Sequence, residues 1–249
     1  MTDASLATVP FNEGDFSVGR VLNRTWSVLS RNLLPFCLVT FIANLPNIAF
    51  FAMIRPGVPA STAVWLLVAA LVGAVLNTLS QAIVLYGAFE DMRGRPVDLV
   101  ESTKIGLRRF FAVLGVALCT AILAGLSAIL LLFPAFIVAT MLFVSLPACV
   151  VERLGPIKSM GRSARLTKGH RWKIFGLWLA VMMILFVVQG TLTGVTAGIG
   201  AGKIPGLVVR YAWSAVWGAF YAILVVVTYH DLRVAKEGVD TDQIAAVFD

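Results

Sequence analysis

Six long stretches of the sequence contain no Asp, Glu, Lys or Arg. They cover residues 33–54, 64–89, 110–133, 135–151, 174–202 and 211–230. A helix needs about 20 mostly apolar residues to cross the roughly 30 Å hydrocarbon layer of a bilayer. The sequence therefore predicts an all-α integral membrane protein with six transmembrane helices, arranged as three hairpins.

Lys and Arg are distributed unevenly between the two ends of these stretches. The segments before the first, between the second and third, between the fourth and fifth, and after the last hold 3, 5, 7 and 2 of them. The other three connections hold 1, 0 and 2, and all 13 acidic residues lie on the cation-rich side. Because loops rich in Lys and Arg stay in the cytoplasm, we expect both termini to be cytoplasmic.

The composition is that of a membrane protein rather than of a soluble domain. The chain is 59% hydrophobic and 13% charged, whereas about a quarter of the residues of soluble domains are charged. We expect a polar tail over 1–14 without the features of a secretory leader, a membrane domain over 15–230, and a cytoplasmic tail over 231–249. The net charge of +7 follows from the orientation bias and favours anionic lipid headgroups, so nucleic acid is not an expected partner.

The apolar stretch 110–151 needs a turn within it. Its 42 residues carry no charge, which is enough for two crossings. Proline lacks an amide donor and clashes with the preceding helical turn, so the turn is predicted at Pro134. The alternative is one long kinked helix. It would place the later segments rich in Lys and Arg on the opposite side of the membrane from the earlier ones.

A short amphipathic segment precedes each odd-numbered crossing. In the first, one face carries Val18, Val21, Leu22, Trp26 and Leu29, and the other Arg20, Arg24, Ser27 and Arg31. In the last, Ile157, Met160 and Ala164 oppose Lys158, Arg162 and Arg165, and Gly169 is expected to end the helix. The middle segment, 98–109, opens with Asp98 and Glu101 in capping-box spacing. Helices of this kind lie in the interface, so we predict three cytoplasmic interfacial helices that form a basic collar.

The segment Val151–Gly176 is the most distinctive part of the chain. It reads VERLGPIKSMGRSARLTKGHRWKIFG, and it is accompanied by FSVGRVLNRTW before the first crossing and YHDLRVAKEGVD after the last. In these segments the chain resembles the membrane domain of bacterial glycerophosphoryl diester phosphodiesterases and stand-alone YciC-like membrane proteins. Ala164 departs from the pattern, which has an aromatic residue there. The resemblance implies a polytopic helical protein of the bacterial inner membrane.

The resemblance does not imply an enzyme. A phosphodiesterase of that kind uses metal-bound carboxylates and histidines on a soluble barrel, and family alone does not establish function. This chain has two histidines, His170 and His230, at the ends of different crossings, and no acid within any crossing. We therefore predict a non-catalytic protein without a cofactor or metal site. His230 and Asp231 are expected to cap the last helix, with Asp231 paired to a cation of the basic segment.

Three groups of residues are candidate sites. The candidates for binding an anionic headgroup are Lys158, Arg162, Ser163, Arg165, Lys168 and Arg171, although retention of the loop in the cytoplasm also accounts for the cations. The polar residues within the crossings are Asn44, Asn47, Asn77, Gln81 and Gln189, which either pair with one another or line a hydrated cavity. Gly190, Gly194 and Gly198 recur at every fourth residue and are predicted to form a helix-packing groove within the chain, with a homodimer contact or an acyl-chain groove as alternatives. A leucine at Gly194 is accordingly predicted to be destabilising.

The function predicted from these features is to bind or organise lipid, or an amphiphilic anion, through the basic collar. An uncoupled channel or export component is one alternative, because the crossings lack the ionisable residues of ion-coupled transporters. An accessory subunit of an enzyme or transporter complex is the other. Anionic membrane lipids are the expected partners, together with a second copy or a partner membrane subunit.

Overall fold

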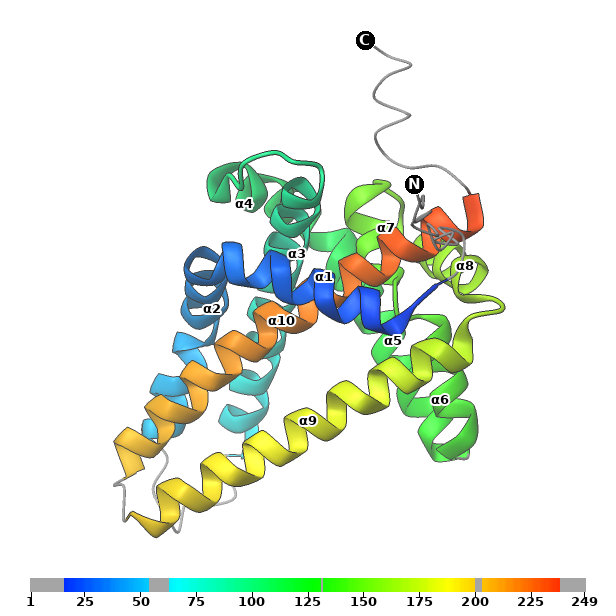
Figure 1. Ribbon diagram of the computed structural model, residues 1–249. Coiled ribbons are helices and arrows are strands. Elements are labelled where there is room, and N and C mark those ends of the chain that lie inside the picture. Colours follow the sequence, from blue (N-terminus) through cyan, green and yellow to red (C-terminus); the bar gives the residue numbers. More distant parts are fainter. Residues whose placement is uncertain (1–15, 54–62, 131, 200–202, 238–249) are drawn as a thin grey trace, which may run out of the picture.

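The computed structural model describes residues 16–53, 63–130, 132–199 and 203–237, and every regular element within these ranges is a helix. The helices are α1 (Val18–Arg31), α2 (Leu33–Met53), α3 (Ala63–Met92), α4 (Leu99–Arg108), α5 (Phe110–Leu130), α6 (Leu132–Met141), α7 (Ser145–Val151), α8 (Pro156–Thr167), α9 (Arg171–Gly198) and α10 (Lys203–Glu237) (Figure 1). The predicted all-α class is confirmed.

Four of the described helices, α3, α5, α9 and α10, are long and apolar enough to cross a membrane. A fifth crossing is obtained if α1 and α2 count as one span, but this pair is bent by 86°. The predicted fourth crossing is not one continuous helix, because it is divided into α6 and α7. The long apolar helices indicate a multi-pass membrane protein with four to five candidate spans.

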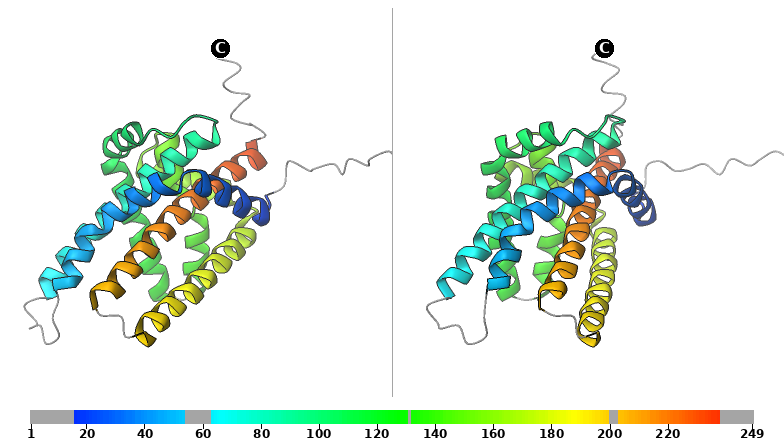
Figure 2. Two further views of the ribbon diagram at one scale, coloured as in Figure 1. Left: turned by 60° about the vertical axis from the view of Figure 1, so that its left-hand side comes forward. Right: turned by 90° about the vertical axis from the view of Figure 1, so that its left-hand side faces the viewer.

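The helix α10 is the centre of the fold. It packs against α1, α2 and α3, and the side chains of Ala219, Ile223 and Val226 are fully buried in the core. In Figure 2, α2, α3, α9 and α10 run in the same general direction, whereas α1 lies across them. The helices α1, α4 and α8 gather at one end of the molecule, whereas α2 and α9 end, and α3 and α10 begin, at the other (Figures 1 and 2).

The chain divides within the apolar stretch 110–151, but not at Pro134. The helix α5 ends at Leu130 and α6 begins at Leu132, so Pro134 lies in the first turn of α6. The two helices pack against each other, which excludes the single long helix. A second division, at residues 142–144 between α6 and α7, was not expected. Pro147 follows this break, in the first turn of α7, where its missing amide donor is tolerated.

The start of α4 and the end of α8 lie at residues that the sequence marks as helix boundaries. Asp98 caps α4, because its Oδ1 accepts hydrogen bonds from the amides of Val100, at 2.8 Å, and Glu101, at 3.2 Å. The helix α8 ends at Thr167, and Gly169 has a φ of 91°, as expected for a glycine after a helix.

The face of α8 that packs against the rest of the protein was not identified from the sequence. Its buried residues are Ser159, Ser163, Leu166 and Thr167, whereas Ile157, assigned to the apolar face, is 82% exposed. The buried face is a row of small hydroxyl side chains, because α8 packs closely against the end of α6 and against α7.

The glycine row of α9 has no packing role among the described residues. A Cβ atom added at Gly190, Gly194 or Gly198 would meet nothing within 4 Å, so the predicted packing groove within the chain is not present there. Close approaches occur instead at glycines of α4 and α5. A Cβ atom at Gly106 would lie 2.8 Å from Cγ1 of Ile83, and one at Gly115 would lie 2.8 Å from Cγ of Pro156.

Candidate functional site

Arg162, in the middle of α8, links the ends of α7 and α10. Its Nε donates to Glu152 at the end of α7, at 2.8 and 3.0 Å from the two carboxylate oxygens. Its terminal nitrogens donate to Glu237 in the last turn of α10. Tyr229 donates its hydroxyl to Oε1 of Glu152 at 2.6 Å. The hydrogen bonds with Glu237, followed by those with Glu152, raise the pKa of Arg162 above its usual range. Arg162 therefore stays charged, with its hydrogen-bonding capacity occupied within the protein.

Ser163 satisfies the backbone at the break between α6 and α7. Its hydroxyl donates to the carbonyl of Met141 at 2.7 Å and accepts from the amide of Val144 at 3.2 Å. Thr167 approaches the same Met141 carbonyl at 3.5 Å. A helix break leaves backbone groups without intrahelical partners, and an unpaired buried group costs about 1–3 kcal/mol. Both hydroxyls of the basic segment thus have a structural role that the sequence alone did not reveal.

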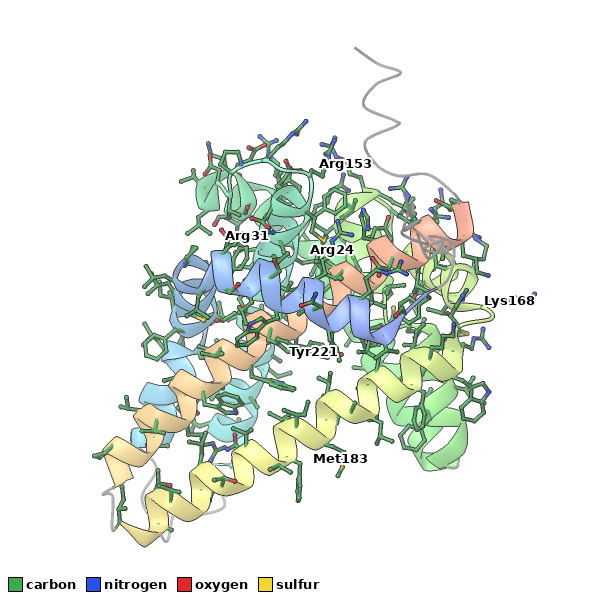
Figure 3. All side chains as sticks on the ribbon, in the orientation of Figure 1. Arg24, Arg31, Arg153, Lys168, Met183 and Tyr221 are labelled. Carbon is green, nitrogen blue, oxygen red and sulfur yellow. The ribbon has the colours of Figure 1, made fainter. Side chains whose placement is uncertain are left out.

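The remaining cations of α8 and the following turn point away from the protein. We call Lys158, Arg165 and Lys168 the α8 cluster. All three are exposed, and none forms an ion pair among the residues that the structure describes. Figure 3 shows Lys168 extending outward, at the same end of the molecule as Arg24, Arg31 and Arg153. These charges are available to an external anion, whereas Arg162 is not.

Arg171 lies apart from this cluster, in the first turn of α9. It lines a cavity between α6 and α9 together with aromatic side chains of both helices. Its neighbour Lys173 has a different role, since its Nζ donates to the carbonyl of Phe16 at 3.2 Å and so attaches the start of α1 to α9.

The intramembrane polar residues are not brought together. Gln81 donates to Oδ1 of Asn77 at 2.7 Å, one turn away in α3. Asn44 donates to the carbonyl of Thr40 at 2.7 Å, within α2. Gln189 is half-buried on α9, and the side chain of Asn47 lies outside the described residues. Four of the five, Asn44, Asn77, Gln81 and Gln189, thus form local pairs or stand alone among the described residues, rather than bonding between helices.

A hydroxyl that links the two long helices α2 and α10 was missed by sequence reasoning. Thr40 of α2 donates to the carbonyl of Ala215 in α10 at 2.8 Å, and its side chain is buried. Threonine is so often bonded to its own helix that no sequence signal distinguishes this one.

Gln81 is one of several polar residues at a second cavity. This cavity has a volume of about 370 Å³ and lies among α3, α5, α6, α7 and α10. Its lining includes Thr78, Gln81, Thr120 and Tyr221. The Thr120 hydroxyl is buried and has no hydrogen-bond partner among the described residues.

Asp231 pairs with a cation from an unexpected helix. Its Oδ1 lies 3.7 Å from Nη1 of Arg24 in α1 and 3.7 Å from Nδ1 of His230. The partner was expected in the basic segment 153–173 and is instead on α1. This contact fixes α1 across the last turns of α10.

No group of three His, Cys, Asp or Glu residues in the described part of the chain is arranged to hold a metal ion. In comparisons with known proteins, no family model matches the chain, and no curated protein or solved structure shows significant similarity. The resemblance to the phosphodiesterase membrane domain stays a prediction.

Proposed function

We propose that the protein is a non-catalytic, multi-pass inner-membrane protein that binds or organises anionic lipid through a basic cytoplasmic surface. In this proposal α2, α3, α5, the α6–α7 pair, α9 and α10 are the six crossings. The cation-rich segments that contain α1, α4 and α8 then face the cytoplasm.

The angle between α1 and α2 supports this topology. The two helices are bent by 86° at Asn32. If α2 crosses the bilayer, α1 therefore lies nearly in the plane of the membrane, as an interfacial helix does. The exposed side chain of Trp26 on α1 suits the same interface, where tryptophan is enriched.

The observation that carries the proposal is the difference between Arg162 and the α8 cluster. Acidic residues neutralise Arg162 from two sides, yet Lys158, Arg165 and Lys168 remain exposed beside it without ion pairs among the described residues. Each cation near an anionic membrane surface contributes about 1 kcal/mol of attraction. A surface of this kind favours anionic lipids in its own leaflet.

Lipid selectivity in reconstituted bilayers tests the proposal. Spin-labelled anionic and zwitterionic lipids would be compared for the fraction immobilised by the protein. We expect an excess of the anionic lipid that falls with rising salt, because exposed charges are screened. Arg165→Glu should reduce this excess more than Arg210→Glu, an exposed cation on the other side of the proposed topology. Equal immobilisation of both lipids by the unmodified protein would contradict the proposal.

An uncoupled channel or export component is the second candidate, favoured by the Thr120 hydroxyl at the 370 Å³ cavity, which has no hydrogen-bond partner among the described residues. If this cavity is a water path, cysteines at Gln81 and Thr120 will react with a water-soluble thiol reagent in intact membranes. Protection of both positions would leave lipid binding as the function.

A further inference from the structure

The cavity between α6 and α9 has a volume of about 440 Å³, within the range of about 300–1,000 Å³ that is usual for small-ligand sites. Its lining residues are Phe136, Ile137 and Thr140 from α6 and Arg171, Trp172 and Phe175 from α9. It lies at the first two turns of α9, directly after the turn that carries Lys168.

The walls of this cavity suit hydrocarbon. The rings of Phe136 and Phe175 meet edge to face with centroids 5.2 Å apart, and Trp178 stacks on Phe175 at 6.4 Å. Thr140 offers no free hydroxyl proton, because its Oγ1 donates to carbonyls of its own helix. An apolar ligand can therefore lie against Thr140 without leaving its hydroxyl unpaired, but one other position in the wall carries a buried donor without a partner among the described residues.

That position is Arg171. Its Nε is buried and has no hydrogen-bond partner among the residues that the structure describes. A buried donor without an acceptor is costly, and the planar guanidinium matches the oxygen atoms of a phosphate or carboxylate. The cavity thus combines an apolar interior with one cationic group that has no anionic partner in the described part of the chain.

The cavity is also accessible from the outer surface of the protein. Trp172 is 77% exposed and Ile137 is 42% exposed, so the rim is formed by side chains that contact the surroundings. Trp and Arg side chains are placed at membrane interfaces with the apolar part inward and the polar part toward water. A membrane lipid reaches such a rim directly from its own leaflet.

We infer that this cavity binds one acyl chain of an anionic lipid, with the lipid phosphate on Arg171. The inference rests on the proposed function, and it adds a defined site to a surface that otherwise attracts anionic lipids diffusely. The chain would lie against Phe136, Ile137 and Phe175.

Titration with lysophosphatidate, which has one acyl chain and one phosphate, tests the site. Binding to the full chain in a non-ionic detergent would be followed by native mass spectrometry, with lysophosphatidylcholine and inorganic phosphate as comparison ligands. Two variants address the site: Arg171→Gln removes the cation, and Ile137→Trp fills the cavity from an exposed position. Arg95→Gln, in the turn between α3 and α4, is the control with the same loss of charge, and thermal melting verifies that each variant is folded.

We expect Arg171→Gln and Ile137→Trp each to weaken lysophosphatidate binding at least tenfold, and Arg95→Gln to change it less than twofold. Lysophosphatidylcholine should bind more weakly than lysophosphatidate, and inorganic phosphate should not compete. Binding that survives in folded Ile137→Trp, or competition by inorganic phosphate, would overturn the site. If substitutions in the α8 cluster weaken lysophosphatidate binding whereas Arg171→Gln and Ile137→Trp do not, the site is overturned and the proposed function stands.

Discussion

Gly115 of α5 lies close to the start of α8, and one added methyl group tests this approach. The Cβ of an alanine there would lie 2.8 Å from Cγ and 3.5 Å from Cβ of Pro156. Pro156 is the first residue of α8, and its ring cannot rotate away as a flexible side chain would. Either α5 or the start of α8 must therefore shift. Overpacking of this kind costs about 1–3 kcal/mol.

Gly125→Ala is the matched control, because Gly125 lies in the same helix and a Cβ there would meet nothing within 4 Å. Both substitutions gain the same helix propensity, about 1 kcal/mol, so the difference between them reports the contact alone. For a chain of this size 1 kcal/mol shifts the melting temperature by about 2–4 °C. In detergent, Gly115→Ala should melt about 2–12 °C below Gly125→Ala by the same conversion. Identical melting temperatures would show that α5 and α8 do not approach as described.

The remaining predictions use the same melting assay. Ser163→Ala should cost about 1–3 kcal/mol, because it leaves backbone groups at the α6–α7 break unpaired. Ser127→Ala, which removes a bond to the carbonyl of Leu123 in its own helix, should cost clearly less, and equal losses would refute the role given to Ser163. Tyr229→Phe should cost about 1.5–3 kcal/mol, since it removes a hydrogen bond to a charged carboxylate; unchanged melting would argue against that bond. Gly194→Leu should not lower stability, because its Cβ meets nothing within 4 Å and leucine has the higher helix propensity, and a clear loss would reveal a packing partner outside the described chain.

The helices could be predicted from local patterns, because apolar runs, caps and glycines act over a few residues. Asp98 before α4 and Gly169 after α8 are examples in which the chemical signal and the structure agree. The break between α6 and α7 also has a local signal, Pro147, whose missing amide cannot continue the helix. That signal was masked by the uniform hydrophobicity of the surrounding residues.

The parts that could not be predicted depend on partners distant in the sequence. Ser163 and Thr167 resemble surface residues of a basic helix until Met141 and Val144 are placed beside them. Hydropathy does not single out the buried face of α8, because close helix packing favours small side chains such as Ser159 and Ser163 there. The glycines of α9 show only that a close approach is possible, and their spacing cannot say whether the partner belongs to the same chain.

The lipids that accompany the protein out of its native membrane test the central claim most directly. The protein would be extracted in a mild detergent, and its bound lipids quantified by mass spectrometry against those of the surrounding membrane. A variant with Lys158→Glu, Arg165→Glu and Lys168→Glu would be treated in parallel. The account predicts enrichment of anionic lipid with the unmodified protein and loss of that enrichment in the variant. A bound-lipid composition equal to that of the membrane in both proteins would contradict it.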